Sequence, residues 1–599
     1  MKKNKEILNS AAADKSQLST TAADRRIETI TGVILLAFGV YHSILYFGHT
    51  AVPNGDFPDL FKIGSDLLSF KRPVGFKQAP VLGLLQNFLY PFAWGTSREL
   101  TAGWLLNAIL HPLNLLLLWL VGKKIVGRAA NWIAVIIIIN PWTIYLLTEP
   151  INETTYLFFI LLSFYLIFKQ SRWAYLAAAA ASMVRYEGAT LILAAFLTDI
   201  MHNKSKPQRI RAIVYSSLAT LPLAIWMLCT VLTWQSGVTH YLSVLFTRDY
   251  SKGFAEPTEN RTGILLNMRV LWQTGFACLL TAYPGINEDL AEVLLKLSRA
   301  TVLVGFLFGC ISSIIKRQRQ VWMLLLFFVP YFLLHAFYPY PLGRFHSTIA
   351  WIVMLVCLFG LQSAGGFLTG KLGVPRVFAL VFQIVLILIS VFWLVGLMPY
   401  MGGTSALSPR SATMPYAAMA VTGLIFAGRL YVERIRWLPK GLTILAVMFL
   451  MIISNQFPLA RLLGDGKREI EFRQLGEWFA ENAEPGDKIA VYNCGPAALF
   501  AGKFADNITG FPKADNPEQL VEKLYEQNFT YVVWATREGT SKQHTGYQLM
   551  GLDKNVAFLS RPASIGPYEF VRQIGSERGF VNVFRLKSRS VEQPSESQN

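Results

Sequence analysis

Charged residues are scarce in this chain. Asp, Glu, Lys and Arg make up 15% of its 599 residues, whereas 53% are hydrophobic and the mean hydropathy is +0.39. About a quarter of the residues of a typical soluble domain are charged, so the composition argues against a soluble globular protein. Repeated apolar runs of about 20 residues instead predict a polytopic membrane protein.

Cysteine and acidic residues are also few. Only Cys494 of the five cysteines lies in the polar C-terminal part, which excludes an internal disulfide there, and the five show no metal-site spacing. Lys and Arg outnumber Asp and Glu by 55 to 37, for a formal net charge of +18. In a soluble protein such a charge suggests nucleic-acid binding. Here the basic residues gather in short links between apolar runs, as in cytoplasmic loops. We therefore expect contact with membrane lipids and no nucleic-acid partner.

No small-residue cleavage site follows the first apolar run, at about 27–47, so this run is predicted to be a retained anchor. Over 173–201 we expect a hairpin of two short helices, because one continuous helix would place Arg185 and Glu187 in the middle of a membrane. The other predicted spans are 102–121, 131–147, 152–169, 211–233, 299–315, 321–338, 346–365, 376–396, 414–431 and 440–456. The charges of the links predict about 13 crossings, with the N-terminus in the cytoplasm and the C-terminus outside.

The composition predicts four parts: a disordered cytoplasmic tail (1–26), a transmembrane domain (27–460), an extracytoplasmic α/β domain (461–587) and a disordered end (588–599). In the α/β domain we expect helices at 471–482 and 517–527 and strands at 487–492, 531–534 and 581–586. The expected fold class is thus an α-helical polytopic membrane protein with a C-terminal α/β domain.

Four polar clusters are predicted to lie on the outer side of the membrane. Their ionisable members are Asp56 and Asp59, Glu149 and Glu153, Arg185 and Glu187, and Arg344. Asp56 and Asp59 lie three residues apart in a stretch broken by glycine and proline, within a long loop that spans 48–100. Carboxylates can act as general bases, and arginines can hold a phosphate through forked hydrogen bonds. Together they suit a phosphate-activated sugar carried on a lipid, although each cluster alone is more often a solvated loop than a site.

The order of several motifs resembles a known superfamily. The motifs are Gly55-Asp56-Phe57-Pro58-Asp59, Asn140-Pro141-Trp142, Leu147-Thr148-Glu149-Pro150, the segment 179–188 that contains Arg185-Tyr186-Glu187, and Gly343-Arg344-Phe345. With them the chain resembles the C-type glycosyltransferases, polytopic enzymes that take sugars from polyprenyl-phosphate carriers. It is most similar to the bacterial branch of protein O-mannosyltransferase-like and aminoarabinose-transferase-like proteins.

This resemblance implies an inverting transfer of a hexosyl or pentosyl group from a polyprenyl-monophosphate donor to a lipid, glycan or protein acceptor. It implies that Asp56 is the catalytic base and that Arg185 and Arg344 bind the donor phosphate. Asp59 is expected to support the base or to contact a metal. Some relatives use a divalent metal, but His49, His111 and His346 show no ligand spacing, so no metal ligand is assigned.

Other interpretations of the same features stay open. Glu187 can be the ion-pair partner of Arg185, which would make Arg185 structural. A transporter or a flippase of lipid-linked glycans is the alternative function; it would need polar groups within the spans, for which only His111 and His335 are candidates, and the chain shows no two-half repeat. A polysaccharide polymerase or ligase should have a larger outer loop late in the chain than the stretch at 397–415.

Overall fold

The computed structural model describes the chain in segments. These are residues 22–73, 78–95, 97–127, 130, 141–202, 205–232, 268–269, 271, 288–336, 343–372, 466, 469–491, 494–512, 514, 516–537, 566–576 and 579–587. The spans predicted at 376–396, 414–431 and 440–456, and most of the one at 131–147, lie outside the described residues.

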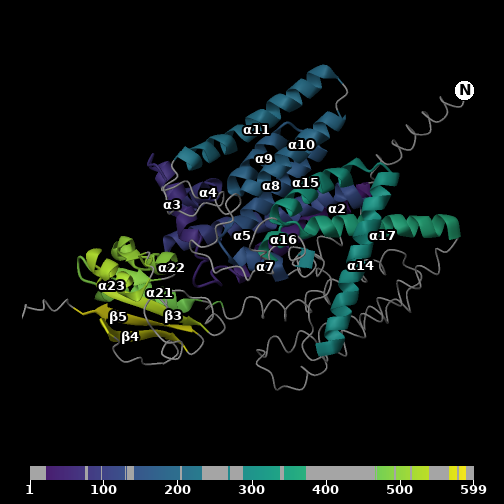
Figure 1. Ribbon diagram of the computed structural model, residues 1–599. Helices are drawn as coiled ribbons and strands as arrows, with labels where there is room; N and C mark the ends of the chain where they lie inside the picture. The colour runs from purple at the N-terminus through teal and green to yellow at the C-terminus, as the bar shows by residue number, and fades with distance from the viewer. Residues whose placement is uncertain are drawn as a thin grey trace, which may run out of the picture.

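The described part consists of a helical body with a small α/β domain at one end (Figure 1). The helices of the body are α2 (Ala22–Leu45), α3 (Phe57–Leu68), α4 (Val81–Leu89), α5 (Arg98–Val126), α7 (Pro141–Thr148), α8 (Asn152–Phe168), α9 (Trp173–Val184), α10 (Ala189–His202), α11 (Lys206–Leu232), α14 (Glu288–Ile315), α15 (Arg319–Ala336), α16 (Gly343–Ser347) and α17 (Ala350–Leu372), with the 3-10 turns η1 (Tyr90–Phe92) and η3 (Tyr186–Gly188). The expected break in the 173–201 segment is present between α9 and α10.

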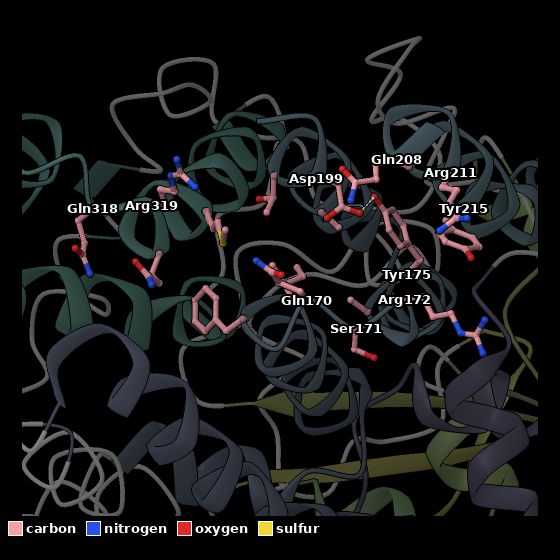
Figure 2. Close-up of a pocket in the computed structure, with 18 of the residues that line it drawn as sticks. Gln170, Ser171, Arg172, Tyr175, Asp199, Gln208, Arg211, Tyr215, Gln318 and Arg319 are labelled. Atoms are coloured by element: carbon pink, nitrogen blue, oxygen red, sulfur yellow. Dashed lines mark hydrogen bonds between the residues drawn. The ribbon is translucent and has the colours of Figure 1, made fainter. Parts of the chain in front are cut away.

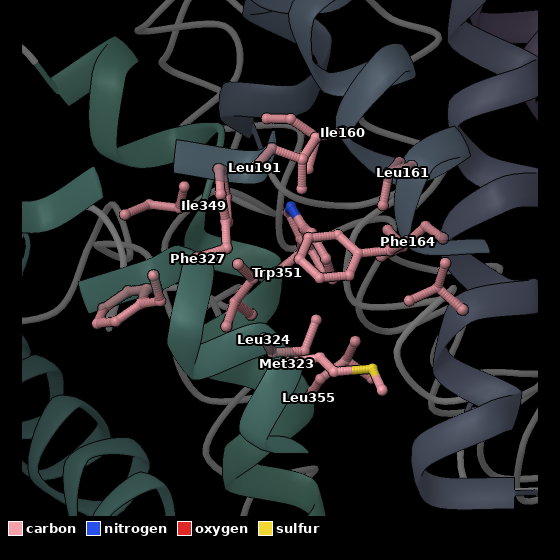
Figure 3. Close-up of a cluster of buried hydrophobic side chains, with 14 of the residues drawn as sticks. Ile160, Leu161, Phe164, Leu191, Met323, Leu324, Phe327, Ile349, Trp351 and Leu355 are labelled. Atoms are coloured by element: carbon pink, nitrogen blue, oxygen red, sulfur yellow. The ribbon is translucent and has the colours of Figure 1, made fainter. Parts of the chain in front are cut away.

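The centre of the body is packed with aromatic and branched side chains from α8, α10, α15 and α17 (Figure 3). Phe164 contacts Phe327 and Trp351 edge-on, each at a ring-centroid distance of 5.7 Å. Edge-to-face pairs of this kind are a favoured aromatic geometry. This core fixes the ends of α8 and α15, which carry site residues.

Glycines bring α14 and α17 into backbone contact. Gly305 and Gly309 lie four residues apart on α14, and a methyl group on Gly309 would collide with the Val356 carbonyl of α17. Gly360 of α17 lies against the backbone of Gly305 and Gly309. Small residues at this spacing allow close helix packing in membranes, where no hydrophobic force draws two apolar helices together.

Two described helices, α5 and α11, are long and apolar enough to cross a membrane. They differ in their surroundings. In the most apolar 18 residues of each helix, 61% of the residues are buried in α5 and 22% in α11. Exposed apolar side chains such as Leu218, Ile225 and Leu228 therefore cover most of α11. An apolar face of this size is unusual in water and is what a lipid-facing helix presents.

The α/β domain has a five-stranded sheet in the order β2-β1-β3-β5-β4. Its elements are α21 (Ile470–Asn482), β1 (Ile489–Val491), α22 (Cys494–Ala498), η5 (Gly502–Asn507), β2 (Ile508–Thr509), α23 (Pro517–Glu526), β3 (Tyr531–Arg537), β4 (Tyr568–Ser576) and β5 (Gly579–Leu586). Strands β2, β1 and β3 are parallel, whereas β5 and β4 pair antiparallel. The helices and strands expected in this part are present, and α22, β2 and β4 are additional.

The α/β domain contacts the body at α3. Phe500 and Leu499 join an apolar cluster with Phe57 and Leu100, and α22 packs against α3. The carbonyl of Gly466 also accepts a hydrogen bond from the Ala51 amide at 2.9 Å. The domain thus lies against the segment that contains Asp56.

Helix α3 corrects the expectation that Asp56 and Asp59 lie in an irregular loop. Asp56 is the N-cap of α3, and Asp59 is in its first turn. Pro58 near the start of the helix and buried Phe57, Leu60 and Ile63 explain the helix, because proline is tolerated in the first turn and the apolar residues share one face.

Candidate functional site

A cavity of about 310 Å³ opens where the start of α3, the first turn of α8, the α9–α10 turn, the end of α15 and α16 meet. Five of the seven predicted site residues line it: Asp56, Glu153, Arg185, Glu187 and Arg344. The fold thus brings together side chains from four segments that are far apart in sequence.

The Asp56 carboxylate faces this cavity because it does not cap its own helix. An N-cap aspartate usually accepts a hydrogen bond from the first turn, but the Asp56 side chain makes no such bond. Its Oδ2 lies 3.6 Å from Arg344 Nη2, and 38% of the side chain is exposed. A carboxylate with this exposure at the cavity is accessible to a substrate.

Glu153 is held at the cavity by buried amides behind it. Asn107 of α5 donates from Nδ2 to the carbonyls of Leu146, Leu147 and Glu149, at 3.3, 3.1 and 2.7 Å. Gln86 of α4 donates to the next carbonyl, that of Pro150, at 3.0 Å. These bonds fix the turn between α7 and α8, so Glu153 enters the cavity from the first turn of α8.

Arg185 is clamped between two carboxylates. Its Nη1 lies 2.8 Å from Glu153 Oε1, and its Nη2 lies 3.0 Å from Glu187 Oε1. The guanidinium also lies 4.5 Å from the centroid of the Phe345 ring, a distance typical of a cation–π contact. The ion-pair alternative foreseen for Arg185 is therefore present in this structure, with Glu153 as an additional partner.

Glu187 belongs to the turn between α9 and α10, outside both helices. Burial alone would raise its pKa, but the Arg185 guanidinium beside it holds the pKa at about 2. The carboxylate is therefore ionised at neutral pH. His335 of α15 completes the cluster, with Nε2 at 3.5 Å from Glu187 Oε1.

Arg344 lies farther from its two carboxylates than Arg185 does from its own. Its Nε lies 3.5 Å from Glu153 Oε1 and its Nη2 lies 3.6 Å from Asp56 Oδ2, both beyond usual hydrogen-bond lengths. Its side chain is 18% exposed, compared with 11% for Arg185. Arg344 therefore bridges Asp56 and Glu153 at the cavity.

Two predicted site residues do not line the cavity. Asp59 is exposed on the first turn of α3. Glu149 is buried in the turn before α8, where its carbonyl accepts from Asn107. The roles expected for Asp59 and Glu149 stay predictions.

The sequence analysis assigned no role at the site to three residues that line the cavity: Gln78, His335 and Phe345. Gln78 is 4% exposed, and its Nε2 makes no hydrogen bond within the described part of the chain. The centroid of the Phe345 ring lies near both guanidiniums, 4.5 Å from that of Arg185 and 5.3 Å from that of Arg344. Because Phe345 directly follows Arg344, the sequence could have indicated that it lies at the site. The sequence does not show that Gln78 and His335 line the cavity, because their positions depend on the fold.

Over the described ranges, no group of three or more His, Cys, Asp or Glu residues is arranged to hold a metal ion. His111 is buried within α5, with its ring 5.8 Å from that of His42. His346 is also buried, with its ring 6.0 Å from that of His335. Divalent-metal dependence stays an open alternative.

No protein-family model and no curated protein matches the sequence. The structure, however, is similar to that of ArnT from Cupriavidus metallidurans, solved bound to undecaprenyl phosphate, with a TM-score of 0.52 at 12% identity. The similarity covers 92% of this chain and 97% of ArnT. The apo form of ArnT gives a TM-score of 0.51, also at 12% identity, over 94% of this chain and 98% of ArnT.

The oligosaccharyltransferase AglB from Archaeoglobus fulgidus, solved with an inhibitory peptide and a dolichol-phosphate, is a more distant match. Its TM-score is 0.48 at 13% identity, over 86% of this chain and 70% of AglB. The likeness to ArnT confirms the fold that the motifs predicted, that of the C-type glycosyltransferases, and it shows the fold alone. The number of crossings and insertion into a membrane stay predictions. The chain's place in a particular branch of that superfamily stays a prediction.

Proposed function

We propose that this protein is an integral membrane glycosyltransferase that moves a sugar from a polyprenyl-monophosphate carrier to an extracytoplasmic lipid, glycan or protein. The observation that carries the proposal is the cavity in which Asp56 and Glu153 share Arg344. A base and a phosphate-binding cation therefore adjoin each other on a fold that matches ArnT over nearly its whole length. A transporter requires no such base.

In the proposed reaction, the acceptor hydroxyl or amine loses its proton to the Asp56 carboxylate as it attacks the anomeric carbon. The new bond forms from acceptor oxygen or nitrogen to carbon, and the bond from carbon to the phosphate oxygen breaks. The electron pair leaves with the polyprenyl phosphate, whose charge Arg344 neutralises. Attack opposite the leaving phosphate inverts the anomeric centre.

The two arginines are given different parts in this proposal. Arg344 lies 3.6 Å from Asp56 and 3.5 Å from Glu153 at the cavity, and we assign its guanidinium fork to the donor phosphate. Arg185 is committed to Glu153 and Glu187 at 2.8 and 3.0 Å, and we assign it first to holding those carboxylates in place. Its contact with the donor phosphate stays a prediction. Gln78, with its buried amide at the cavity, is a further donor to the phosphate or the sugar.

The membrane arrangement is part of the proposal. About 13 crossings, a cytoplasmic N-terminus, a transmembrane domain at 27–460 and an extracytoplasmic α/β domain at 461–587 place the cavity at the outer surface. The exposed apolar face of α11 supports insertion of the helical body into lipid.

The test begins with mass spectrometry of glycans and glycolipids from cells with and without the protein, which identifies the dependent product. Asp56→Asn keeps the shape of the side chain but removes its basicity. We expect the product to fall about 100- to 10,000-fold, the usual effect of losing a general base. The matched control Asp59→Asn, one helical turn further along α3, should lose far less.

Normal product formation by Asp56→Asn, with loss in Asp59→Asn, would reverse the two roles. Normal formation by both variants would refute the mechanism. If purified protein transfers no sugar while cells lacking it accumulate lipid-linked sugar on the cytoplasmic side, the transporter or flippase alternative holds.

A further inference from the structure

A second cavity, of about 560 Å³, lies at the opposite ends of helices that form the first. Helix α15 begins at the second cavity with Arg319 and reaches the first with His335. Its 18 residues correspond to a length of about 27 Å, close to the thickness of a bilayer core of about 30 Å. Helix α9 likewise runs from the second cavity to Arg185. The two cavities therefore open toward opposite membrane surfaces.

Three separate parts of the chain contribute arginines to the second cavity. Arg172 comes from the α8–α9 link, Arg211 from the second turn of α11, Arg317 from the α14–α15 link, and Arg319 is the first residue of α15. Arg319 and Arg211 stand on opposite sides of the cavity (Figure 2). Within the described part of the chain, none of the four forms an ion pair with a carboxylate.

One carboxylate, Asp199, lines the same cavity and accepts a hydrogen bond from the Tyr175 hydroxyl at 2.9 Å (Figure 2). The charge of the lining is therefore strongly positive. Glutamine and serine side chains, including Gln170, Ser171 and Gln318, add neutral hydrogen-bonding groups. Helices α9 and α15 also begin here, and the positive ends of their dipoles favour an anion.

We infer that this second cavity binds a phosphate-bearing anion at the cytoplasmic surface of the membrane. Arginines from three parts of the chain surround a volume suited to a headgroup, and their forked guanidiniums match phosphate oxygens. Arg211 and Tyr215 come from α11, whose apolar face is exposed. Because the cavity adjoins this face, the favoured source of the phosphate is the headgroup of an anionic phospholipid. The inference depends on the proposed insertion of the helical body in a membrane, but it does not depend on the proposed transfer reaction.

The test uses the full-length protein, delipidated in detergent and titrated with phosphatidylglycerol or phosphatidylcholine, with native mass spectrometry as the readout. The variant Arg211→Gln/Arg319→Gln removes two cavity arginines. Lys206→Gln/Arg209→Gln removes the same charge from exposed positions at the start of α11 that do not line the cavity. We expect the first variant to bind phosphatidylglycerol roughly 30-fold more weakly, about fivefold per arginine, and the second to bind nearly as wild type.

A second arm distinguishes a soluble phosphate from a lipid. Inorganic pyrophosphate at constant ionic strength should raise the melting temperature of wild type but not of Arg211→Gln/Arg319→Gln if the phosphate source is soluble. A third arm needs no variant: phenylglyoxal labelling of wild type should modify Arg211 and Arg319 less when the bound probe is present. Equal lipid binding by both variants, no pyrophosphate effect and no protection of these arginines would overturn the inference.

Discussion

At the scale of single residues, the candidate site holds more negative than positive side chains. Asp56, Glu153 and Glu187 face Arg185 and Arg344, so each guanidinium is shared between two carboxylates. An incoming phosphate must compete with these carboxylates for a cation. It can do so most easily at Arg344, whose contacts are 3.5 and 3.6 Å, rather than at Arg185, whose contacts are 2.8 and 3.0 Å.

This difference predicts separable effects of two substitutions. Arg344→Gln should weaken binding of undecaprenyl phosphate by about tenfold or more, the loss of one charge-assisted contact, with little change in melting temperature. Arg185→Gln should mainly destabilise the protein, because it removes the closest cation of both Glu153 and Glu187 and leaves Glu153 only the longer Arg344 contact. Breaking a buried pair in this way costs roughly 3–5 kcal/mol.

Native mass spectrometry with undecaprenyl phosphate and thermal unfolding in the same detergent would measure both effects. The conservative Arg185→Lys, which keeps the charge but not the fork, serves as the control. A stable Arg185→Gln that no longer binds the probe would restore the direct phosphate contact that the resemblance implies for Arg185.

At the scale of elements, the geometry of the site depends on a buried polar brace. Asn107 and Gln86 together donate to four carbonyls just before α8, those of Leu146, Leu147, Glu149 and Pro150. The brace sets where α8 begins, and hence where Glu153 enters the cavity. Asn114, two turns further along α5, donates instead to the Thr154 carbonyl at 3.0 Å.

We expect Asn107→Leu to lower transfer about tenfold more than Asn114→Leu, although both remove a buried amide from the same helix. Loss of a buried hydrogen-bond donor costs about 1–3 kcal/mol, so the two variants should melt at similar temperatures. Product formation measured beside thermal unfolding tests this comparison. Equal losses of activity would mean that the brace contributes stability but does not position Glu153.

Some helices and strands could be predicted from the sequence, and others could not. The helix pair at 173–202 was predictable, because Arg185 and Glu187 are costly inside a membrane helix. The start of α3 was missed, since Gly55 and Pro58 suggested a turn although proline also fits a first helical turn. Strand β4 was missed because Glu569, Arg572 and Gln573 give it a weak apolar pattern.

The contacts within the cavity were less predictable than the helices. Asp56, Glu153, Arg185 and Arg344 could be selected by charge and by expected side of the membrane. Their pairing could not, because it depends on the angles at which five segments meet. Gln78 carries no sequence signal of its own, and its position becomes meaningful only when the buried amide is seen at the cavity.

At the scale of the whole molecule, the α/β domain and the helical body meet beside the proposed catalytic base. Phe500 packs in a cluster with Phe57, the residue after Asp56, and Gly495 lies close to Pro58 and Gly55. A methyl group on Gly495 would approach the Pro58 side chain to 3.3 Å and the Gly55 carbonyl to 3.4 Å. The domain therefore supports the start of α3 from the side.

This support predicts that the domain affects the rate of transfer without carrying its chemistry. Phe500→Ala should lower product formation, because a cavity beside Phe57 loosens the start of α3 and thus the aim of Asp56. Phe511→Ala is the matched control, since Phe511 packs within the same domain against a different apolar cluster. Truncating a core phenylalanine typically costs about 3–5 kcal/mol, and we expect less at Phe511, which is only partly buried. Limited proteolysis would first establish that both variants keep the domain folded.

A loss of transfer confined to Phe500→Ala would assign the domain a positioning role, whereas equal activities would show that Asp56 is held by the helical body alone. Transfer by the isolated domain would contradict the assignment of the chemistry to the helical body.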